Sequence, residues 1–358
     1  MSGRVFVALS GGVDSAVAAL LLVRAGHEVH GLHMQNWEDD DGYCTAADDL
    51  QDARAVAREL GIPFHTVDFS AQYRERVFAL FLSELRAGRT PNPDVLCNRE
   101  IKFGDCLAHA RRLGGEWFAT GHYARIETRD DGPVLLKGVD PEKDQSYFLH
   151  AVPRGQFARV TMPLGDRHKR EVRELARSAG LPVSDKPDST GICFIGERPF
   201  RDFLRQHLLD EPGPIVTADG ERLGEHPGLH HYTLGQRGGI GLGGRRDASG
   251  DPWYVAAKRS ADRALVVVQG GDHPLLTSRG VVTEAVNWLA APPREAFECR
   301  VKLRYRQADQ GAVATPCADG GVALRLHEAQ RAVTTGQSAV LYQGDRCWGG
   351  GVIAQTTI

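Results

Sequence analysis

Six consecutive residues near the N-terminus, SGGVDS at positions 10–15, have the composition of a phosphate-binding loop. Two glycines allow the backbone to turn tightly, and the amides at the start of a following helix would point at an anion. Ser10 and Ser15 add hydroxyl donors, whereas Asp14 would be repelled by phosphates unless it held a cation, so Mg²⁺ is implied. The alternative is an Asp-capped helix after a glycine turn, which is common but rarely carries this whole pattern.

Two of the seven cysteines have unusual neighbours, although no pair forms the CxxC pattern of a structural zinc site. Cys97 lies in TPNPDVLCNREIKF (90–103), where two prolines give an extended entry and Asp94 could cap a turn that presents the thiol near a helix start. Arg99 and Lys102 could then lower its pKa. Cys193 lies in a polar loop, DKPDSTGICFI (185–195). Neither context is decisive alone, because a cysteine is often a small buried hydrophobe.

Strands that alternate with helices must position these residues. We expect strands at 5–9, 28–34, 64–68 and 117–120, and helices at 15–25, 48–60, 73–87 and 101–113. This alternation predicts an α/β domain with a parallel sheet and a ligand site at the carboxyl ends of its strands. GxxxxGK[ST] is absent from the chain and GxGxxG from this loop, which argues against a Walker or a dinucleotide site.

Near residue 210 helical periodicity ends, and a glycine-rich, strand-like texture begins. We expect strands at 213–217, 229–233, 253–257, 264–269, 299–305, 321–326 and 338–342, and a hinge-like loop at 235–250. Two small β domains, the last a β-barrel, fit this pattern. The predicted division is 1–208 for the nucleotide-binding domain, 209–274 for the central β domain and 275–358 for the barrel.

The charge distribution permits a local basic face on a slightly acidic chain. The net charge is −3, yet residues 154–177 hold seven basic and three acidic side chains, whereas residues 38–52 hold seven acidic ones and no Lys or Arg. Charge alone does not separate this from two solvated helix surfaces. No apolar run is long enough to cross a bilayer, and the five-residue apolar stretch near the N-terminus is too short for the core of a signal peptide. We therefore expect a cytoplasmic protein without a membrane partner.

The SGGVDS loop resembles that of the ATP-pyrophosphatase (PP-loop) enzymes, which cleave ATP to AMP and pyrophosphate. Further motifs, PNPDVLCNREIKF, ATGHYA, KDQSYFL, DSTGICFIGER, LGQRGGIGLGG, PWYV and KLRYRQ, resemble in order those of the tRNA 2-thiouridylases. The resemblance spans almost the whole chain. It implies a PP-loop, Rossmann-like N-terminal domain, and an enzyme that makes 2-thiouridine at the wobble position of tRNA. It implies ATP contacts at Ala8, Leu9, Ser10, Gly11, Gly12, Val13, Asp14, Ser15, Met34 and Gly121.

The resemblance also implies the sulfur chemistry. Cys193 would carry a persulfide received from a sulfur-relay protein or a cysteine desulfurase, and Cys97 would form a disulfide with Cys193 as sulfur is transferred. Asp94 would act as an acid–base group. The tRNA contacts would be Asn92, Pro93, Asp94, His122, Lys143, Asp144, Gln145, Arg304, Tyr305 and Gln337. The substrate would be the anticodon stem-loop of tRNAs for lysine, glutamate and glutamine.

Three alternatives stay open from the sequence. A carboxylate-activating PP-loop synthetase or amidotransferase would explain SGGVDS, but it would leave the cysteines and the β domains without a role. A thiolase could instead hold an iron–sulfur cluster on Cys97, Cys193 and Asp94. A non-catalytic, ATP-gated tRNA-binding protein would tolerate the loss of Cys193.

Overall fold

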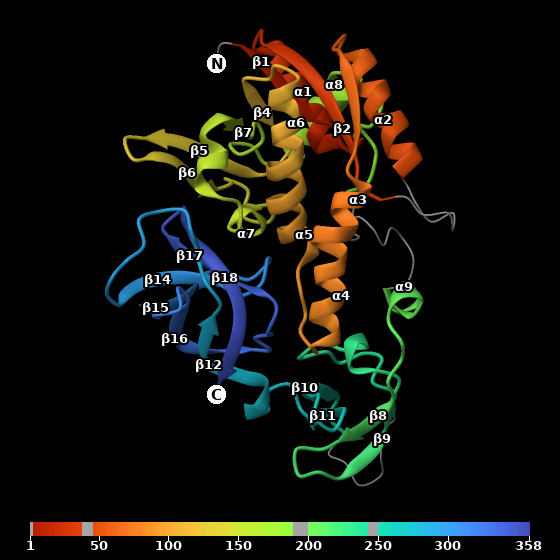
Figure 1. Cartoon of the computed structure of the whole chain (residues 1–358), viewed down its shortest axis with the longest axis vertical. Coiled ribbons are helices and arrows are strands. Elements are labelled where there is room, and N and C mark those ends of the chain that lie inside the picture. Colours follow the sequence, from red (N-terminus) through yellow and green to blue (C-terminus); the bar gives the residue numbers. More distant parts are fainter. Residues whose placement is uncertain (1–2, 38–45, 189–199, 243–249) are drawn as a thin grey trace.

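The computed structural model describes residues 3–37, 46–188, 200–242 and 250–358, and every structural statement below concerns these residues. They form three sheets (Figure 1). A five-stranded sheet lies near the N-terminus, and a four-stranded and a nine-stranded sheet lie toward the opposite end of the molecule.

The N-terminal sheet has the order β3-β2-β1-β4-β7, and each neighbouring pair is parallel. The chain runs outward from β1 to β3 and then returns to the other side of β1, so the loops after β1 and β4 meet at a topological switch point. The predicted parallel sheet is thus confirmed. Its strands are β1 (Arg4–Ala8), β2 (Glu28–Gln35), β3 (Phe64–Asp68), β4 (Trp117–Ala119) and β7 (Val160–Thr161).

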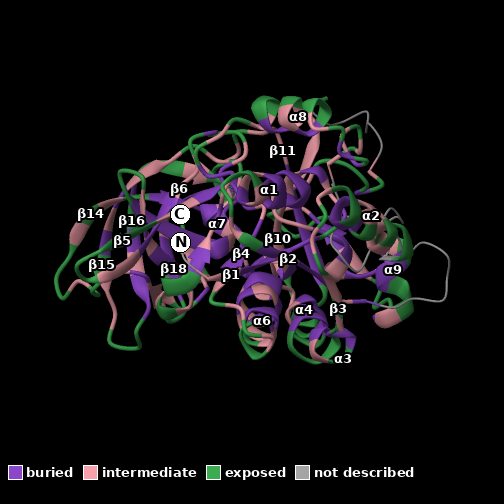
Figure 2. Ribbon diagram, turned by 90° about the horizontal axis from the view of Figure 1, so that it is seen from above, coloured by how far each residue is buried: buried purple, intermediate pink, exposed green. Residues whose placement is uncertain are grey.

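Helices cover both faces of this sheet. Alternate residues of β1 and Leu9, which follows it, therefore enter two different cores. Val5, Val7 and Leu9 pack with α1 (Val13–Arg24), α2 (Ala46–Glu59) and α8 (Lys169–Ser178), whereas Phe6 and Ala8 belong to the core on the opposite face. Figure 2 shows α1 and α8 on one side of β1 and β2, and α3, α4 and α6 on the other. Such double burial explains why the strand is apolar without alternation.

Two long helical runs form the second cover, and each begins earlier than the sequence predicted. The first consists of α3 (Ser70–Tyr73), a π-helical turn (Arg74–Phe78) and α4 (Ala79–Arg86). The second consists of α5 (Pro93–Leu96), a π-helical segment (Cys97–Cys106) and α6 (Leu107–Arg112). Asn92 starts the second run, since its Oδ1 accepts from the amides of Asp94 (3.1 Å) and Val95 (3.4 Å). The predicted cap, Asp94, therefore lies inside the helix.

The barrel expected at the C-terminus is confirmed. Six strands follow the order β12-β16-β15-β14-β17-β18, and pairing between β12 and β18 closes the ring. They are β12 (Thr277–Thr283), β14 (Phe297–Lys302), β15 (Gln310–Pro316), β16 (Val322–Arg331), β17 (Ser338–Gln343) and β18 (Arg346–Thr357), with β13 (Asn287–Trp288) also on β18.

A hairpin from the N-terminal half, β5 (Ala124–Arg129) and β6 (Gly132–Lys137), extends the barrel sheet through the pair Leu136–Arg346. The sequence did not predict this hairpin. The helical segments that follow it are α7 (Ser146–Leu149) and a 3-10 turn (Arg154–Arg159). The two halves of the chain therefore share one sheet.

The central sheet has the order β10-β11-β8-β9, with β8 (Gly213–Val216), β9 (Arg222–His226), β10 (Trp253–Arg259) and β11 (Ala264–Gln269). The prediction of a strand at 229–233 was wrong, because a 3-10 turn (Leu229–His231) lies there instead. Helix α9 (Phe200–His207) precedes this sheet, and another 3-10 turn (Pro274–Leu276) follows it. None of the described helices is both long and apolar enough to cross a membrane.

Candidate active site

The SGGVDS loop joins β1 to α1 at the carboxyl edge of the parallel sheet. Ser15 Oγ accepts from the amide of Ser10 (3.2 Å) and donates to the carbonyl of Gly12 (3.0 Å), so the two ends of the turn are tied together. Gly11 has φ +82°, a left-handed conformation that favours glycine. The candidate ATP residues 8–15 thus form one turn that leads into a helix N-terminus, the arrangement that binds phosphates.

Gly121 lies directly against this loop. A Cβ atom at Gly121 would come within 2.8 Å of the backbone of Asp14 and Ser15, so a larger residue would displace the start of α1. Met34, the other predicted contact outside the loop, lies on the neighbouring strand β2 and is partly buried. The switch point therefore brings together the three segments from which the sequence predicted ATP contacts.

A cluster of charged side chains faces the loop. Asp14 Oδ1 accepts from Lys169 Nζ and from the Tyr123 hydroxyl, both at 2.7 Å. Lys169 also pairs with Asp188 (2.8 Å), which in turn pairs with Lys143 (2.7 Å). Burial raises the pKa of Asp188, but hydrogen bonds from Lys143 and Lys169 outweigh it and hold that pKa below its usual range. The sequence had placed Lys169 only in the basic stretch 154–177, and it had given Tyr123 and Asp188 no role.

The acidic start of α2 also meets the loop. Lys186 Nζ donates to the carbonyl of Gly11 (3.2 Å) and pairs with Asp49 (2.7 Å) and Asp52 (2.5 Å). A Cβ at Gly11 would lie 2.3 Å from the Asp49 carbonyl. These two acidic residues are therefore paired at the site rather than solvated on a remote surface.

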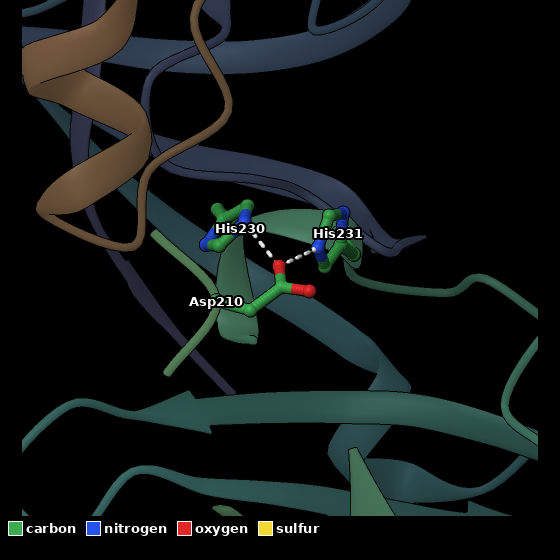
Figure 3. A group of neighbouring side chains, drawn as sticks. All are labelled: Asp210, His230 and His231. Carbon is green, nitrogen blue, oxygen red and sulfur yellow. Dashed lines mark hydrogen bonds and ion pairs between the residues drawn. The ribbon is translucent and has the colours of Figure 1, made fainter. Parts of the chain in front are cut away.

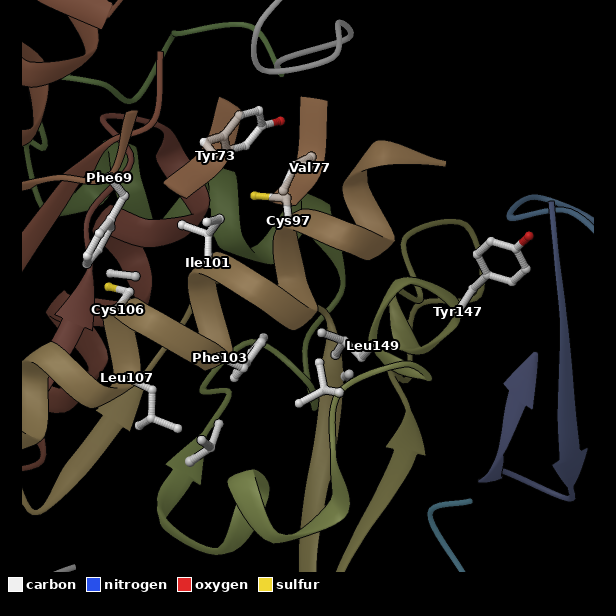
Figure 4. Packing of buried hydrophobic residues seen from close by; sticks show 14 of the residues in the cluster. Phe69, Tyr73, Val77, Cys97, Ile101, Phe103, Cys106, Leu107, Tyr147 and Leu149 are labelled. Carbon is white, nitrogen blue, oxygen red and sulfur yellow. The ribbon is translucent and has the colours of Figure 1, made fainter. Parts of the chain in front are cut away.

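Cys97 is buried in the second turn of its helix, with 1% of its surface exposed. Figure 4 shows it beside Tyr73, Val77 and Ile101 in the core, with Cys106 farther along the same helical run. Burial raises the pKa of Cys106 to about 12, which makes that thiol inert at neutral pH. Cys193 lies outside the described residues, and so does the predicted pairing of Cys97 with it.

The residues before Cys97 differ in their accessibility. Pro93 is buried, whereas Asn92 and Asp94 are half-buried. Burial raises the pKa of the Asp94 carboxyl, and the charge of Lys102 offsets this only in part. Raised carboxyl pKa values are common among acid–base groups, although structural sites share them.

The KDQ motif turns mainly toward the protein interior. Asp144 is 2% exposed, pairs with Lys302 (3.0 Å) and accepts from the amides of Gly138 and Ser146, both at 3.1 Å. The Gln145 side chain accepts from the amide of Tyr123 (3.0 Å). In this structure the Asp144 carboxylate is held by protein groups, so the predicted RNA contact at Asp144 would require the segments that cover it to move.

His122 is also more enclosed than expected, with 8% of its surface exposed. Its Nδ1 lies 2.8 Å from Thr120 Oγ1 and its ring 5.7 Å from that of Phe103. Burial holds its pKa well below the usual value, and the charge of Lys102 acts in the same direction. The imidazole is therefore neutral at physiological pH.

The barrel reaches toward this site through the residues predicted to bind RNA. Gln337 Nε2 donates to the carbonyl of Thr90 (2.7 Å), directly before the PNPD segment. Tyr305 packs on Phe148 with ring centroids 4.4 Å apart, and Arg304 donates to the carbonyl of Ala332. The barrel thus supports the start of the Cys97 helix.

The parallel sheet with its glycine–serine loop at the switch point defines a PP-loop nucleotide-binding domain followed by β domains. Comparison with protein families matches residues 3–197 to the tRNA methyl transferase HUP domain, 201–269 to the tRNA methyl transferase PRC-barrel domain and 278–353 to the Aminomethyltransferase beta-barrel domain.

The full-length relatives define the family more narrowly. The "tRNA-specific 2-thiouridylase MnmA" of Marinobacter nauticus is 55% identical over 359 residues, which cover 99% of this chain and 91% of the relative. That of Burkholderia multivorans is 55% identical and covers 98% of this chain and 93% of its own length. The chain therefore belongs to the tRNA-specific 2-thiouridylase family.

Similarity to a solved structure of another enzyme is much weaker. An NMN synthetase from Francisella tularensis is 21% identical with a TM-score of 0.35, and the match covers 57% of this chain and 72% of that chain. A likeness this weak carries no information about the chemistry.

Proposed function

We propose that this chain converts the wobble uridine of tRNA into 2-thiouridine and consumes ATP in doing so. The observation that carries the proposal is the identity of 55% with 2-thiouridylases over 99% of the chain. The loop at the switch point supports it, because it presents a helix N-terminus where the phosphates of ATP would lie. The proposal includes three domains, at 1–208, 209–274 and 275–358, and a cytoplasmic location.

In the first step, the C2 oxygen of uridine attacks the α-phosphorus of ATP and pyrophosphate leaves, so that a poor leaving group becomes AMP. The amides at the start of α1 and the ammonium group of Lys169 would bind the phosphates. Lys169 would exchange its contact with Asp14 (2.7 Å) for a phosphate oxygen. A Mg²⁺ ion would neutralise charge on the departing pyrophosphate. Asp14 fits such an ion, because Mg²⁺ often takes one protein carboxylate and otherwise phosphate oxygens and water.

In the second step, the outer sulfur of a persulfide on Cys193 attacks C2. The Cys97 thiolate then attacks the inner sulfur of Cys193 and forms a disulfide, and the electron pair of the broken S–S bond stays on the transferred sulfur. The C2–sulfur double bond forms as AMP leaves, and an external thiol later reduces the disulfide. Cys97 is 1% exposed, so this cycle requires the segments that cover it to move.

The substrate side of the proposal involves the region between the PNPD segment and the barrel. Five predicted residues remain candidates for RNA contacts because they are half-buried or exposed: Asn92, Asp94, Arg304, Tyr305 and Gln337. Of the barrel residues among them, Gln337 contacts Thr90, directly before the PNPD segment. Asp94 would move a proton near the target base, as its raised pKa supports. A sulfur-relay protein or a cysteine desulfurase would supply the persulfide, and tRNAs for lysine, glutamate and glutamine would be the acceptors.

Single-turnover thiolation of unmodified tRNA tests the proposal. The reaction contains ATP, Mg²⁺ and a persulfide source, and thiouridine is detected by retardation on a mercury-containing gel. We compare wild type with Cys97→Ser, Cys193→Ser and the control Cys317→Ser, which alters a half-exposed barrel cysteine. Product from wild type and the control alone is expected.

Other outcomes separate the alternatives. Product from every variant would keep the thiolase but end the persulfide–disulfide cycle, whereas brown colour with visible absorption in anaerobic protein would favour an iron–sulfur cluster. Pyrophosphate release without thiouridine would favour a carboxylate-activating enzyme. Binding of tRNA without any pyrophosphate release would favour a binding protein.

A further inference from the structure

Three side chains with metal-binding atoms converge where the central sheet joins the linker after α9. Asp210 lies in the linker, and His230 and His231 lie in the 3-10 turn Leu229–His231. Figure 3 shows both imidazoles turned toward the Asp210 carboxylate. One ligand atom from each of the three residues lies within 4.8 Å of the other two. This cluster plays no part in the proposed thiolation.

Hydrogen bonding within the described chain does not satisfy the cluster. His231 Nε2 lies 2.6 Å from Asp210 Oδ1, but His230 Nε2 lies 3.5 Å from the same oxygen. His230 Nε2 is buried and makes no hydrogen bond to any described residue, whereas the unpaired His231 Nδ1 lies on the side of its ring away from Asp210. A buried nitrogen without a partner is unfavourable, and an imidazole nitrogen aimed at a carboxylate is a ready metal ligand.

The ring of His230 is held in this orientation by its surroundings. It packs on Gly228, where a Cβ atom would come within 2.6 Å of His230 Cε1. The rings of His230 and His231 lie side by side, with centroids 4.1 Å apart. Any side chain at position 228 would push the first imidazole away from Asp210, so glycine permits the convergence.

We propose that Asp210, His230 and His231 form a binding site for one Zn²⁺ ion, with water in the fourth position. Zinc takes imidazole nitrogens and carboxylate oxygens at about 2.0–2.1 Å in a tetrahedron, which places ligand atoms roughly 3.4 Å apart. The His230–Asp210 distance of 3.5 Å already matches, and the His231–Asp210 distance of 2.6 Å has to lengthen by less than 1 Å.

Charges around the cluster act on the ion in both directions. The Asp210 carboxylate compensates one positive charge, whereas Arg205, whose Nε lies 3.4 Å from Asp210 Oδ2, and buried Lys258 oppose a further cation. Only Asp210 Oδ1 is needed as a ligand, so Arg205 can keep its contact with the second oxygen.

The ion would clasp the linker to the central domain. Helix α9 is anchored on the N-terminal half through Phe203, whose ring lies 5.8 Å from that of Phe78, and Asp210 follows three residues after the helix ends. Leu209, next to the ligand, is 89% exposed. An ion shared by Asp210 and the two histidines would therefore restrain the segment between α9 and β8.

Metal titration of the full chain, after treatment with a chelator, tests the site. Co²⁺ serves as the spectroscopic probe and Zn²⁺ as its competitor. We expect one Co²⁺ per chain with tetrahedral d–d absorption and no thiolate charge-transfer band, and displacement by Zn²⁺. Asp210→Asn and His230→Ala should each weaken binding at least about 10-fold. Zn²⁺ should also slow proteolytic cleavage after Leu209 in wild type but not in Asp210→Asn.

The matched control is His226→Gln, which changes a buried neighbouring histidine whose Nε2 is bound to the carbonyl of Arg263 (2.8 Å). This variant should bind Co²⁺ as wild type does. Asp210 is exposed, so Asp210→Asn should fold, and circular dichroism verifies this. The proposal would be overturned by the absence of stoichiometric binding or by a thiolate charge-transfer band. It would also be overturned if Asp210→Asn and His230→Ala bound Co²⁺ with the affinity of wild type. None of these readouts depends on thiolation.

Discussion

The buried ion pair between Asp144 and Lys302 joins the two halves of the molecule, and we predict that Lys302→Met destabilises it strongly. Their side chains are 1% and 9% exposed, and Nζ lies 3.0 Å from Oδ2. Asp144 belongs to the turn before α7, and Lys302 ends β14 of the barrel. Removal of the lysine would leave a carboxylate without its counter-charge in the interior.

The magnitude follows from burial. Loss of one partner of a buried pair costs about 3–5 kcal/mol, against roughly 0–1 kcal/mol for an exposed pair. Asp144 keeps two backbone N–H donors at 3.1 Å, from Gly138 and Ser146, so we expect the lower end of that range. About 3 kcal/mol corresponds to a fall in Tm on the order of 6–12 °C for a cooperative unit of 150–250 residues.

Calorimetry of wild type, Lys302→Met, Asp144→Asn and the double variant measures the coupling. The double variant should be more stable than the sum of the single losses predicts, by roughly 0.5–3 kcal/mol. Arg259→Met, which breaks an exposed pair with Asp262, is the control and should cost less than about 1 kcal/mol.

A Tm within about 2 °C of wild type for Lys302→Met, or strictly additive losses, would refute this reasoning. The same variants examine the earlier expectation that Asp144 contacts RNA. If it did, Asp144→Asn would lose tRNA affinity at temperatures where both single variants are folded, and Lys302→Met would keep it.

Three further predictions concern the nucleotide site and the acid–base group Asp94. Gly121→Ala should destabilise the loop by about 1–3 kcal/mol and slow pyrophosphate release, because its Cβ would meet backbone at 2.8 Å. The control Gly155→Ala has open space around the new Cβ, so calorimetry and the pyrophosphate assay should find its stability and its rate unchanged. Lys169→Met should weaken ATP binding in equilibrium dialysis by roughly 10-fold or more, the value of a charged hydrogen bond, and Arg170→Met on the exposed face of α8 should not. Asp94→Asn should abolish thiolation yet raise Tm at pH 7. Burial raises the pKa of Asp94, so the stability of wild type falls as pH rises from 3.8 through the folded-state pKa and stays lower above it. If the difference in Tm between Asp94→Asn and wild type were the same at pH 3.5 and at pH 7, this prediction would be contradicted.

The sequence predicted the elements that depend on local pattern. The β1 strand, the glycine loop and α1 were expected because a buried apolar run, a turn and helical spacing are all visible in neighbouring residues. The start of the second helical run was misplaced, since the Asn92 cap and Pro93 looked like part of an extended loop. The barrel was predicted from short strands and turns, but the β5–β6 hairpin that extends its sheet was not.

The sequence by itself determined the fold class, the nucleotide loop and the family, because these reside in contiguous motifs whose chemistry is local. Only the tertiary structure decided which charges meet. It paired Lys169 with Asp14 across 155 positions, and Lys302 with Asp144 across 158. It likewise gathered Asp210 and two histidines into one cluster. Side chains far apart in sequence become neighbours only when sheet order and domain packing set their distance, and no local pattern encodes that distance.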